Sequence, residues 1–207
     1  MRTSRLLLLG VAAAASVGLL GVGSANASEG GLLCLENKEP CPPGARYVPP
    51  TILETQLKEG TEAVFETDLG SVACKKSGFR LTETEDGVPM LGKIESLSFN
   101  ECLLGKTKCT ATPVNLPYDA QIKNPELGNA LLVMKKGAAG EPGVEVVCGS
   151  GLNMKCLFSG EPQLPMTGGT PALFKTTSSE NLKRTGVLCP KEFAKWVAVH
   201  VGSDPKQ

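Results

Sequence analysis

Residues 195–201 read KWVAVHV, a run of aromatic and β-branched residues that is typical of a strand. On an extended chain, Trp196, Ala198 and His200 would share one face, and the intervening valines would share the other. The same two-residue alternation returns, with one short apolar run at 130–134, in residues 52–57, 61–67, 72–74, 79–81, 93–101, 108–114, 118–123, 144–148 and 154–158. We therefore predict a β-strand at each of these segments.

Turn residues separate the predicted strands. The chain has 24 glycines and 15 prolines, and turn signals fall at 68–70, 86–87, 137–143 and 168–169. No stretch shows the helical period over 10–15 residues that a βαβ unit needs; one helical turn is predicted at Pro190–Ala194, with proline in a favoured first position. The sequence predicts an all-β fold, an antiparallel sandwich or barrel-like domain of about ten or eleven short strands.

The first 27 residues have the pattern of a secretory signal peptide. Arg2 and Arg5 precede an uncharged apolar stretch at 6–22, and small residues lead to a predicted cleavage between Ala27 and Ser28. A membrane anchor would need about 20 apolar residues, whereas this stretch is shorter and interrupted by glycines. We expect 1–27 to be removed, 28–50 to be an irregular Pro/Gly-rich segment, and 51–207 to form the β domain.

All eight cysteines lie after the predicted cleavage point: Cys34, Cys41, Cys74, Cys102, Cys109, Cys148, Cys156 and Cys189. An even number of cysteines in an exported chain predicts disulfides. A zinc site would need C-x2-C pairs or Cys/His clusters, and the sequence has neither. Many pairings are open. Proximity along the chain favours Cys34–Cys41, Cys102–Cys109 and Cys148–Cys156, which leaves Cys74 to join Cys189.

Charge excludes several function classes. The 21 basic and 21 acidic residues are dispersed without a basic block, which argues against nucleic acid as a partner. No amphipathic Lys/Arg-rich helix is present to hold a membrane surface, so we expect no stable membrane insertion after cleavage. Phosphate-binding glycine loops, haem motifs and calcium loops are also missing, and no cofactor or metal is predicted.

Catalytic candidates are few. His200 is the only histidine that a Ser/His/Asp hydrolase could use, and the predicted mature part has no G-x-S-x-G motif. The place of His200 in an alternating strand favours a packed or edge histidine over a catalytic one. Glu62 with Glu66, and Glu83 with Glu85, would each share a strand face, a spacing that any solvated sheet also shows. An alternative function is therefore a secreted hydrolase that uses an Asp/Glu pair on polysaccharide or peptide.

Residues Leu164–Gly168 read LPMTG, the string by which sortases attach proteins to cell walls. A sorting signal continues into an apolar span and a basic tail. Here polar residues at 169–183 follow, then Cys189 and the predicted strand that contains Trp196. We therefore interpret LPMTG as an ordinary Pro/Gly turn.

Several short motifs occur together along the chain: Cys34-x6-Cys41, GTEA at 60–63, VACKKS at 72–77, GKIESLSFNEC at 92–102, the cysteine at 148 after Val144, and Cys189-Pro190 before KWVA at 195–198. As a set they resemble a large group of predicted secreted, cysteine-containing β proteins of unknown function, present as paralogues in high-GC soil bacteria. The resemblance covers essentially the whole predicted mature chain. It implies export and a β fold, and it assigns no activity or binding residue.

The export signal, the predicted disulfides and the lack of a catalytic motif favour a non-enzymatic extracellular binding or structural protein. Its expected partner is a surface polymer or another protein. A small-ligand carrier is a third possibility if the sheet closes around a cavity.

Overall fold

The protein folds into antiparallel β-strands, and no helix occurs in the part described here. The computed structural model describes residues 47–87, 89–126, 129–149, 154–167, 173–176, 182–189 and 195–203. Thirteen strands lie in these ranges: β1 (Ile52–Leu57), β2 (Ala63–Thr67), β3 (Gly70–Glu85), β4 (Met90–Leu104), β5 (Thr107–Val114), β6 (Tyr118–Glu126), β7 (Asn129–Lys135), β8 (Gly143–Cys148), β9 (Met154–Gly160), β10 (Gln163–Thr167), β11 (Leu173–Thr176), β12 (Leu182–Val187) and β13 (Trp196–Gly202).

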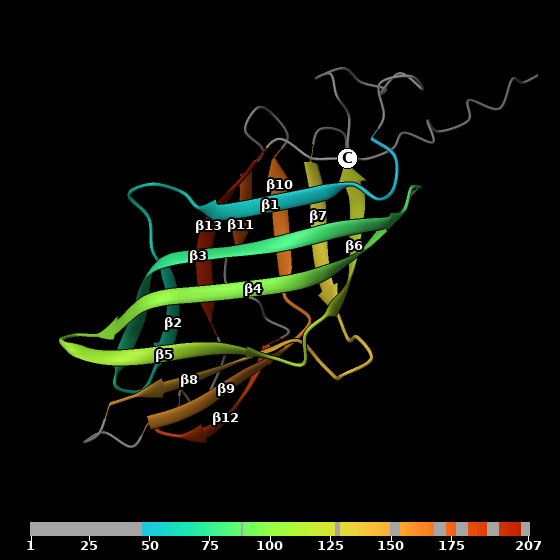
Figure 1. Ribbon diagram of the computed structural model, residues 1–207. Coiled ribbons are helices and arrows are strands. Elements are labelled where there is room, and N and C mark those ends of the chain that lie inside the picture. The colour runs from blue at the N-terminus through green and yellow to red at the C-terminus, as the bar shows by residue number, and fades with distance from the viewer. Residues whose placement is uncertain are drawn as a thin grey trace, which may run out of the picture.

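Two long strands, β3 and β4, organise the sheet. They pair with each other along most of their length, and each has a different neighbour at its two ends. The start of β3 pairs with β2 and its later part with β1, while the start of β4 pairs with β6 and its end with β5. In Figure 1, β1, β3, β4 and β5 cross the front of the molecule, and β13, β11, β10, β7 and β6 run steeply behind them. The result is two layers whose strand directions cross.

A smaller part of the sheet continues beyond β4. Its order is β5-β8-β9-β12, and we call these four strands the wing. Figure 1 shows β8, β9 and β12 at the bottom of the molecule. Within the described residues, β12 pairs only with β9, so it forms the outer edge of the wing.

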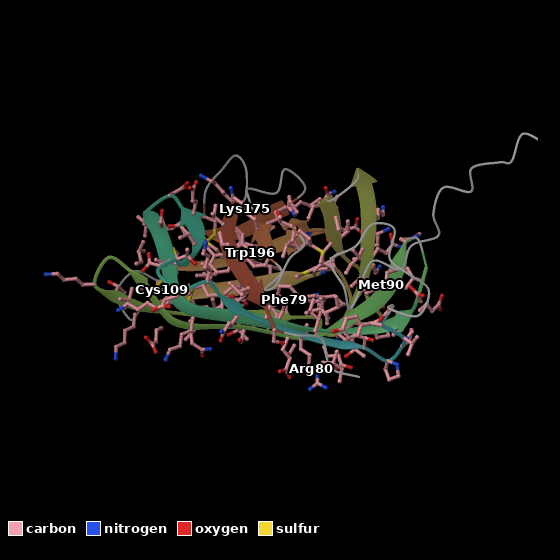
Figure 2. All side chains as sticks on the ribbon, turned by 90° about the horizontal axis from the view of Figure 1, so that it is seen from above. Phe79, Arg80, Met90, Cys109, Lys175 and Trp196 are labelled. Carbon is pink, nitrogen blue, oxygen red and sulfur yellow. A yellow bond between two sulfur atoms is a disulfide. The ribbon has the colours of Figure 1, made fainter. Side chains whose placement is uncertain are left out.

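The core fills the space between the layers. Phe65 of β2 lies 5.0 Å from Phe99, 5.3 Å from Phe158 and 6.2 Å from Trp196, measured between ring centroids. These rings come from β2, β4, β9 and β13, so the cluster joins both layers and the wing. Figure 2 shows the alternation on β3, where Phe79 points inward toward Trp196 and Arg80 points away. Burying aromatic rings of this size is a major source of stability in a β domain.

The predicted all-β antiparallel fold is confirmed, and most strands begin and end within three residues of the prediction. The two segments at 72–74 and 79–81 belong to one strand, β3. Three strands were not predicted, β10, β11 and β12. The predicted signal peptide, Cys34, Cys41 and the helical turn at Pro190–Ala194 lie outside the described residues, and of the segment 28–50 only 47–50 is described.

The interpretation of LPMTG as a turn is wrong for residues 164–167, which belong to β10. This strand pairs with β7 from Gln163 to Thr167 and buries Leu164 and Met166. Pro165 has no backbone N–H to donate. This is tolerated because β11 pairs with β10 only at Met166 and Thr167 and leaves Pro165 without a partner on that side among the described residues. Such an unpaired side of a strand is where a sheet tolerates proline.

Three disulfides occur among the described cysteines: Cys74–Cys102, Cys109–Cys148 and Cys156–Cys189. The predicted pairs Cys102–Cys109, Cys148–Cys156 and Cys74–Cys189 are therefore wrong. The reason is the strand order, which proximity along the chain does not reveal. Because β5 lies between β4 and β8, Cys109 has a cysteine directly opposite on each side.

Candidate functional site

The strongest catalytic candidate, His200, lies in the interior. Its Nε2 is 3.0 Å from Oγ of Ser77, and the exposed fractions of the two residues are 0% and 6%. The ring packs edge-on against Phe79 and Trp196, at centroid distances of 5.4 and 6.4 Å. Of the two alternatives expected from the sequence, a packed or an edge histidine, this position is the packed one.

The Ser77–His200 pair has the distance of a nucleophile and its base, but its surroundings do not suit hydrolysis. A working triad holds the second imidazole nitrogen with an acid, and Nδ1 of His200 has no hydrogen-bond partner among the described residues. Burial also lowers the pKa of His200 from 6.5 to about 4, because an imidazolium would lose its hydration there. A substrate would have to open the core to reach Ser77, so we assign this pair a structural role.

The glutamates considered as pairs from the sequence lie in different surroundings. Glu66 forms an ion pair with Lys195, with Oε1 2.7 Å from Nζ, while Glu62 is exposed before β2 begins. Glu83 is 1% exposed and Glu85 is exposed, because the register between β3 and β4 shifts between these two residues. The expectation that Glu83 and Glu85 share a face is therefore wrong: an extra residue in β3 turns Glu85 outward.

Glu83 is the one buried carboxyl among the described residues. Its backbone N–H donates to the carbonyl oxygen of Thr51 at 2.8 Å, and its Oε2 has no hydrogen-bond partner among the described residues. Burial raises the pKa of Glu83, against a smaller lowering by the Thr51 side chain. A buried acid of this kind could serve as a general acid. The Asp86 carboxylate is close enough to raise its pKa slightly further, but no contact among the described residues joins the two carboxyls.

The interior offers little space for a ligand. The cavity beside Phe65, Tyr118 and Trp196 has a volume of about 20 Å³, roughly the room that one water molecule needs. Drug-sized ligands occupy sites of about 300–1,000 Å³. This cavity is therefore too small for the ligand of the small-molecule carrier considered from the sequence.

A larger opening lies at the surface of the wing, where β5 and β9 begin and β8 ends. This groove has a volume of about 650 Å³ and carries two positive side chains and no acid among its described lining residues, which are Lys108, Cys109, Thr110, Val147, Cys148, Gly149, Met154 and Lys155. We call it the lysine groove. Lys108 is exposed, and Val147 is one of the few large apolar side chains on the surface, 37% exposed.

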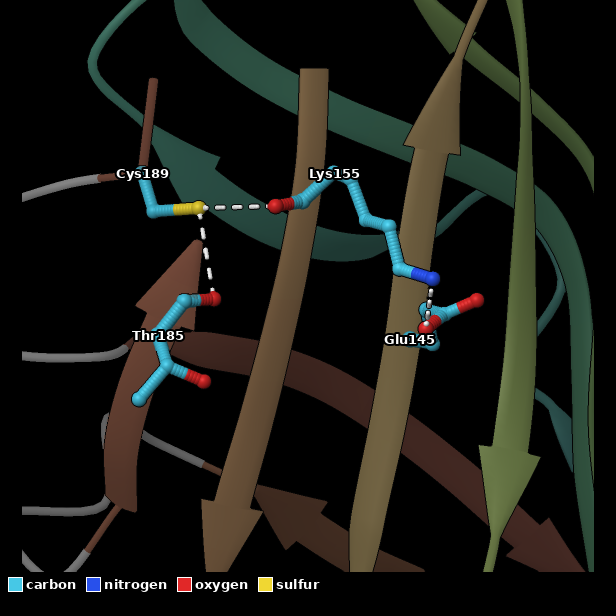
Figure 3. Close-up of polar contacts among 4 residues, drawn as sticks. All are labelled: Glu145, Lys155, Thr185 and Cys189. Atoms are coloured by element: carbon cyan, nitrogen blue, oxygen red, sulfur yellow. Dashed lines mark hydrogen bonds and ion pairs between the residues drawn. The ribbon is translucent and has the colours of Figure 1, made fainter. Parts of the chain in front are cut away.

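Figure 3 shows the side of the groove formed by β9. Nζ of Lys155 lies 2.8 Å from Oε2 of Glu145 on β8. The Lys155 carbonyl oxygen lies 3.4 Å from Sγ of Cys189, and the Thr185 carbonyl oxygen lies 3.6 Å from the same sulfur. A disulfide sulfur carries no hydrogen, so these are close sulfur–oxygen contacts rather than donated hydrogen bonds. They pack the Cys156–Cys189 bridge against the edge of the wing.

Sequence reasoning missed the lysine groove. Its signal is a repeated Lys-Cys dipeptide, at 108–109 and 155–156, which places an outward lysine next to a cysteine that faces the core side of a strand. Two such dipeptides become neighbours only through the β5-β8-β9 order. That order depends on long-range pairing.

The described residues contain no group of three or more His, Cys, Asp or Glu side chains arranged to hold a metal ion. Nor do they form a helix that is long and apolar enough to cross a membrane. The three disulfides indicate an oxidising environment. Comparisons of the chain with protein-family models, with curated proteins and with solved structures found no match.

Proposed function

We propose that this chain is exported, loses residues 1–27, and acts outside the cell as a non-enzymatic binding protein whose contact surface is the lysine groove. The single observation that supports it is the groove itself, which is open, lined by Lys108 and Lys155, and free of acids among its described lining residues. The described core, by contrast, is filled, and its only histidine is buried.

The chemistry of the groove favours a negatively charged cell-surface polymer as the ligand. Lysine ammonium groups bind carboxylates and phosphates as point charges. Lys155 already has one partner in Glu145, and an arriving anion would compete with or replace it. Thr110, on the same strand as Lys108, adds a hydroxyl, and Val147 on β8, between the strands that carry the two lysines, adds an apolar contact.

The test is co-sedimentation of the exported, processed protein with purified bacterial cell-wall material. We expect binding that weakens as salt rises, because exposed charges are screened over about 8 Å at physiological ionic strength. The double variant Lys108→Glu/Lys155→Glu should lose binding. Its matched control, Lys58→Glu/Lys136→Glu, makes the same charge change at exposed lysines outside the groove and should bind like the wild type.

Equal binding by both double variants would contradict the groove as the contact surface, and no binding by the wild type would contradict the proposed ligand. Release of new reducing ends from the same polymer would instead favour the hydrolase alternative. The N-terminal residue of the exported protein tests the processing step, for which we expect Ser28.

A further inference from the structure

Four cysteines lie in one row across four neighbouring strands. In the pairing register, Cys74 of β3 is opposite Cys102 of β4, Cys102 is opposite Cys109 of β5, and Cys109 is opposite Cys148 of β8. The disulfides join the first pair and the last pair. Cys102 and Cys109 are therefore direct neighbours that belong to different bridges.

The geometry of the row also allows an alternative bridge between its two middle cysteines, Cys102 and Cys109. Directly opposite residues of an antiparallel pair have Cα atoms about 4.5–5.5 Å apart, within the reach of a disulfide. The two existing bridges join Cα atoms 3.9 and 4.1 Å apart. A Cys102–Cys109 bridge therefore requires no change in strand register.

Only one cysteine of the row is more than marginally exposed. Cys74, Cys102 and Cys148 are 0%, 4% and 1% exposed, whereas Cys109 is partly buried and lines the lysine groove. Thiol–disulfide exchange requires that a thiolate reach a sulfur of the bridge. Lys108 and Lys155 line the same groove, and their positive charges favour the approach of an anion such as a thiolate.

We propose that Cys109 is a thiol–disulfide exchange site for an external dithiol, and that Cys102 passes the exchange on to Cys74. The inference goes beyond the polymer-binding role and does not depend on it. The substrate is identified by its chemistry, a small or protein-borne dithiol that acts as the two-electron reductant.

The exchange at Cys109 takes two steps. One thiolate of the dithiol attacks Sγ of Cys109, which forms a mixed disulfide and releases Cys148 as a thiolate. The second thiolate of the dithiol then attacks the dithiol's first sulfur, which is bonded to Sγ of Cys109. This releases the Cys109 thiolate and leaves the dithiol oxidised to an internal disulfide. Two electrons have then moved to the protein.

The relay step needs no further reductant. The Cys109 thiolate attacks Sγ of Cys102, so the Cys102–Cys109 bond forms, the Cys74–Cys102 bond breaks, and Cys74 leaves as a thiolate that takes a proton. By this route the buried Cys74–Cys102 bridge becomes reducible from the groove while the strands stay paired.

A single substitution tests the relay without any reductant. Cys148→Ser leaves Cys109 as a thiol opposite Cys102, and we expect part of the protein to carry a Cys102–Cys109 bridge with the free thiol at Cys74. The measurement is non-reducing peptide mapping after acid quenching and alkylation. In the control, Cys156→Ser, the unpaired partner is Cys189, outside the row, so Cys74–Cys102 and Cys109–Cys148 should stay intact.

The wild type provides an independent measurement that does not depend on the folding of a variant. It is treated with less than one equivalent of dithiothreitol at mildly alkaline pH, quenched and mapped in the same way. We expect a Cys102–Cys109 peptide with alkylated Cys74 and Cys148. Finding only alkylated Cys109 and Cys148 beside an intact Cys74–Cys102 bridge, or reduction that begins at another bridge, would overturn the proposal.

Discussion

The imidazole of His200 and the hydroxyl of Ser77 meet in the interior, with 3.0 Å between Nε2 and Oγ, although the two residues are 123 positions apart. β13 carries His200 next to β1, which pairs in turn with β3. This contact therefore ties the last strand of the described chain to one of its longest. It also places a titratable ring where water does not reach it.

We expect stability to fall in mild acid because of His200. The pKa of His200 is about 4 in the folded state and near 6.5 in the unfolded state. Between pH 6.5 and pH 4 the unfolded chain therefore binds a proton at this residue that the folded chain does not bind. The free energy of unfolding should decrease as pH falls from about 6.5 to about 4, by up to about 3 kcal/mol from this residue. Urea denaturation at a series of pH values measures the decrease.

The control is His200→Gln, which retains a group able to bond Ser77 but does not titrate. The difference in unfolding free energy between the two proteins should change over this pH range, since the contributions of all other groups cancel. A constant difference would show that His200 takes up its proton at the same pKa in the folded and the unfolded chain, contrary to its buried position.

Glu83 gives a pH effect of the opposite sign. Its folded pKa is raised by burial, so above the unfolded pKa the carboxylate destabilises the fold, and the penalty is relieved as pH falls through the folded pKa. Glu83→Gln should therefore raise the melting temperature at pH 7, and the gain should vanish below about pH 4. Scanning calorimetry of Glu83→Gln beside the exposed control Glu85→Gln tests this: equal effects would contradict it.

Local sequence patterns predicted much of the fold. The features that were missed depend on pairing between strands that are distant in sequence. The alternation around Trp196 and His200 is a local property, and it predicted the strand and a packed or edge histidine in place of a catalytic one. β10 was missed because Pro165 has the appearance of a turn, while its tolerance depends on where β11 begins. Nothing near Cys109 in sequence indicates whether β4 or β8 supplies its bridge, because both neighbours carry a cysteine opposite it.

The aromatic cluster should dominate the stability of the core. Phe65 is 1% exposed and contacts rings from β4, β9 and β13, so truncation removes contacts on three sides. Phe65→Ala should cost about 3–5 kcal/mol of unfolding free energy. The control Val147→Ala, on the outer face of β8, should stay within about 0.5 kcal/mol. Chemical denaturation followed by circular dichroism compares them, and similar costs would contradict this view of the core.

The Cys156–Cys189 bridge should hold the outer edge of the wing in place. It links residues 33 positions apart, a loop whose closure stabilises a protein by about 3–4 kcal/mol on the chain-entropy model. Among the described strands, β12 pairs only with β9, so without the bridge this edge has one ladder of hydrogen bonds to retain it.

In the double variant Cys156→Ser/Cys189→Ser, deuterium exchange of the β12 backbone amides should therefore accelerate relative to the wild type. Exchange in β3 and β4 should change less, because each of these strands has paired strands on both sides. Hydrogen exchange read by mass spectrometry measures the contrast. Uniform acceleration across β3, β4 and β12 would mean that the bridge stabilises the whole domain equally, whereas unchanged exchange in β12 would mean that its ladder to β9 suffices alone.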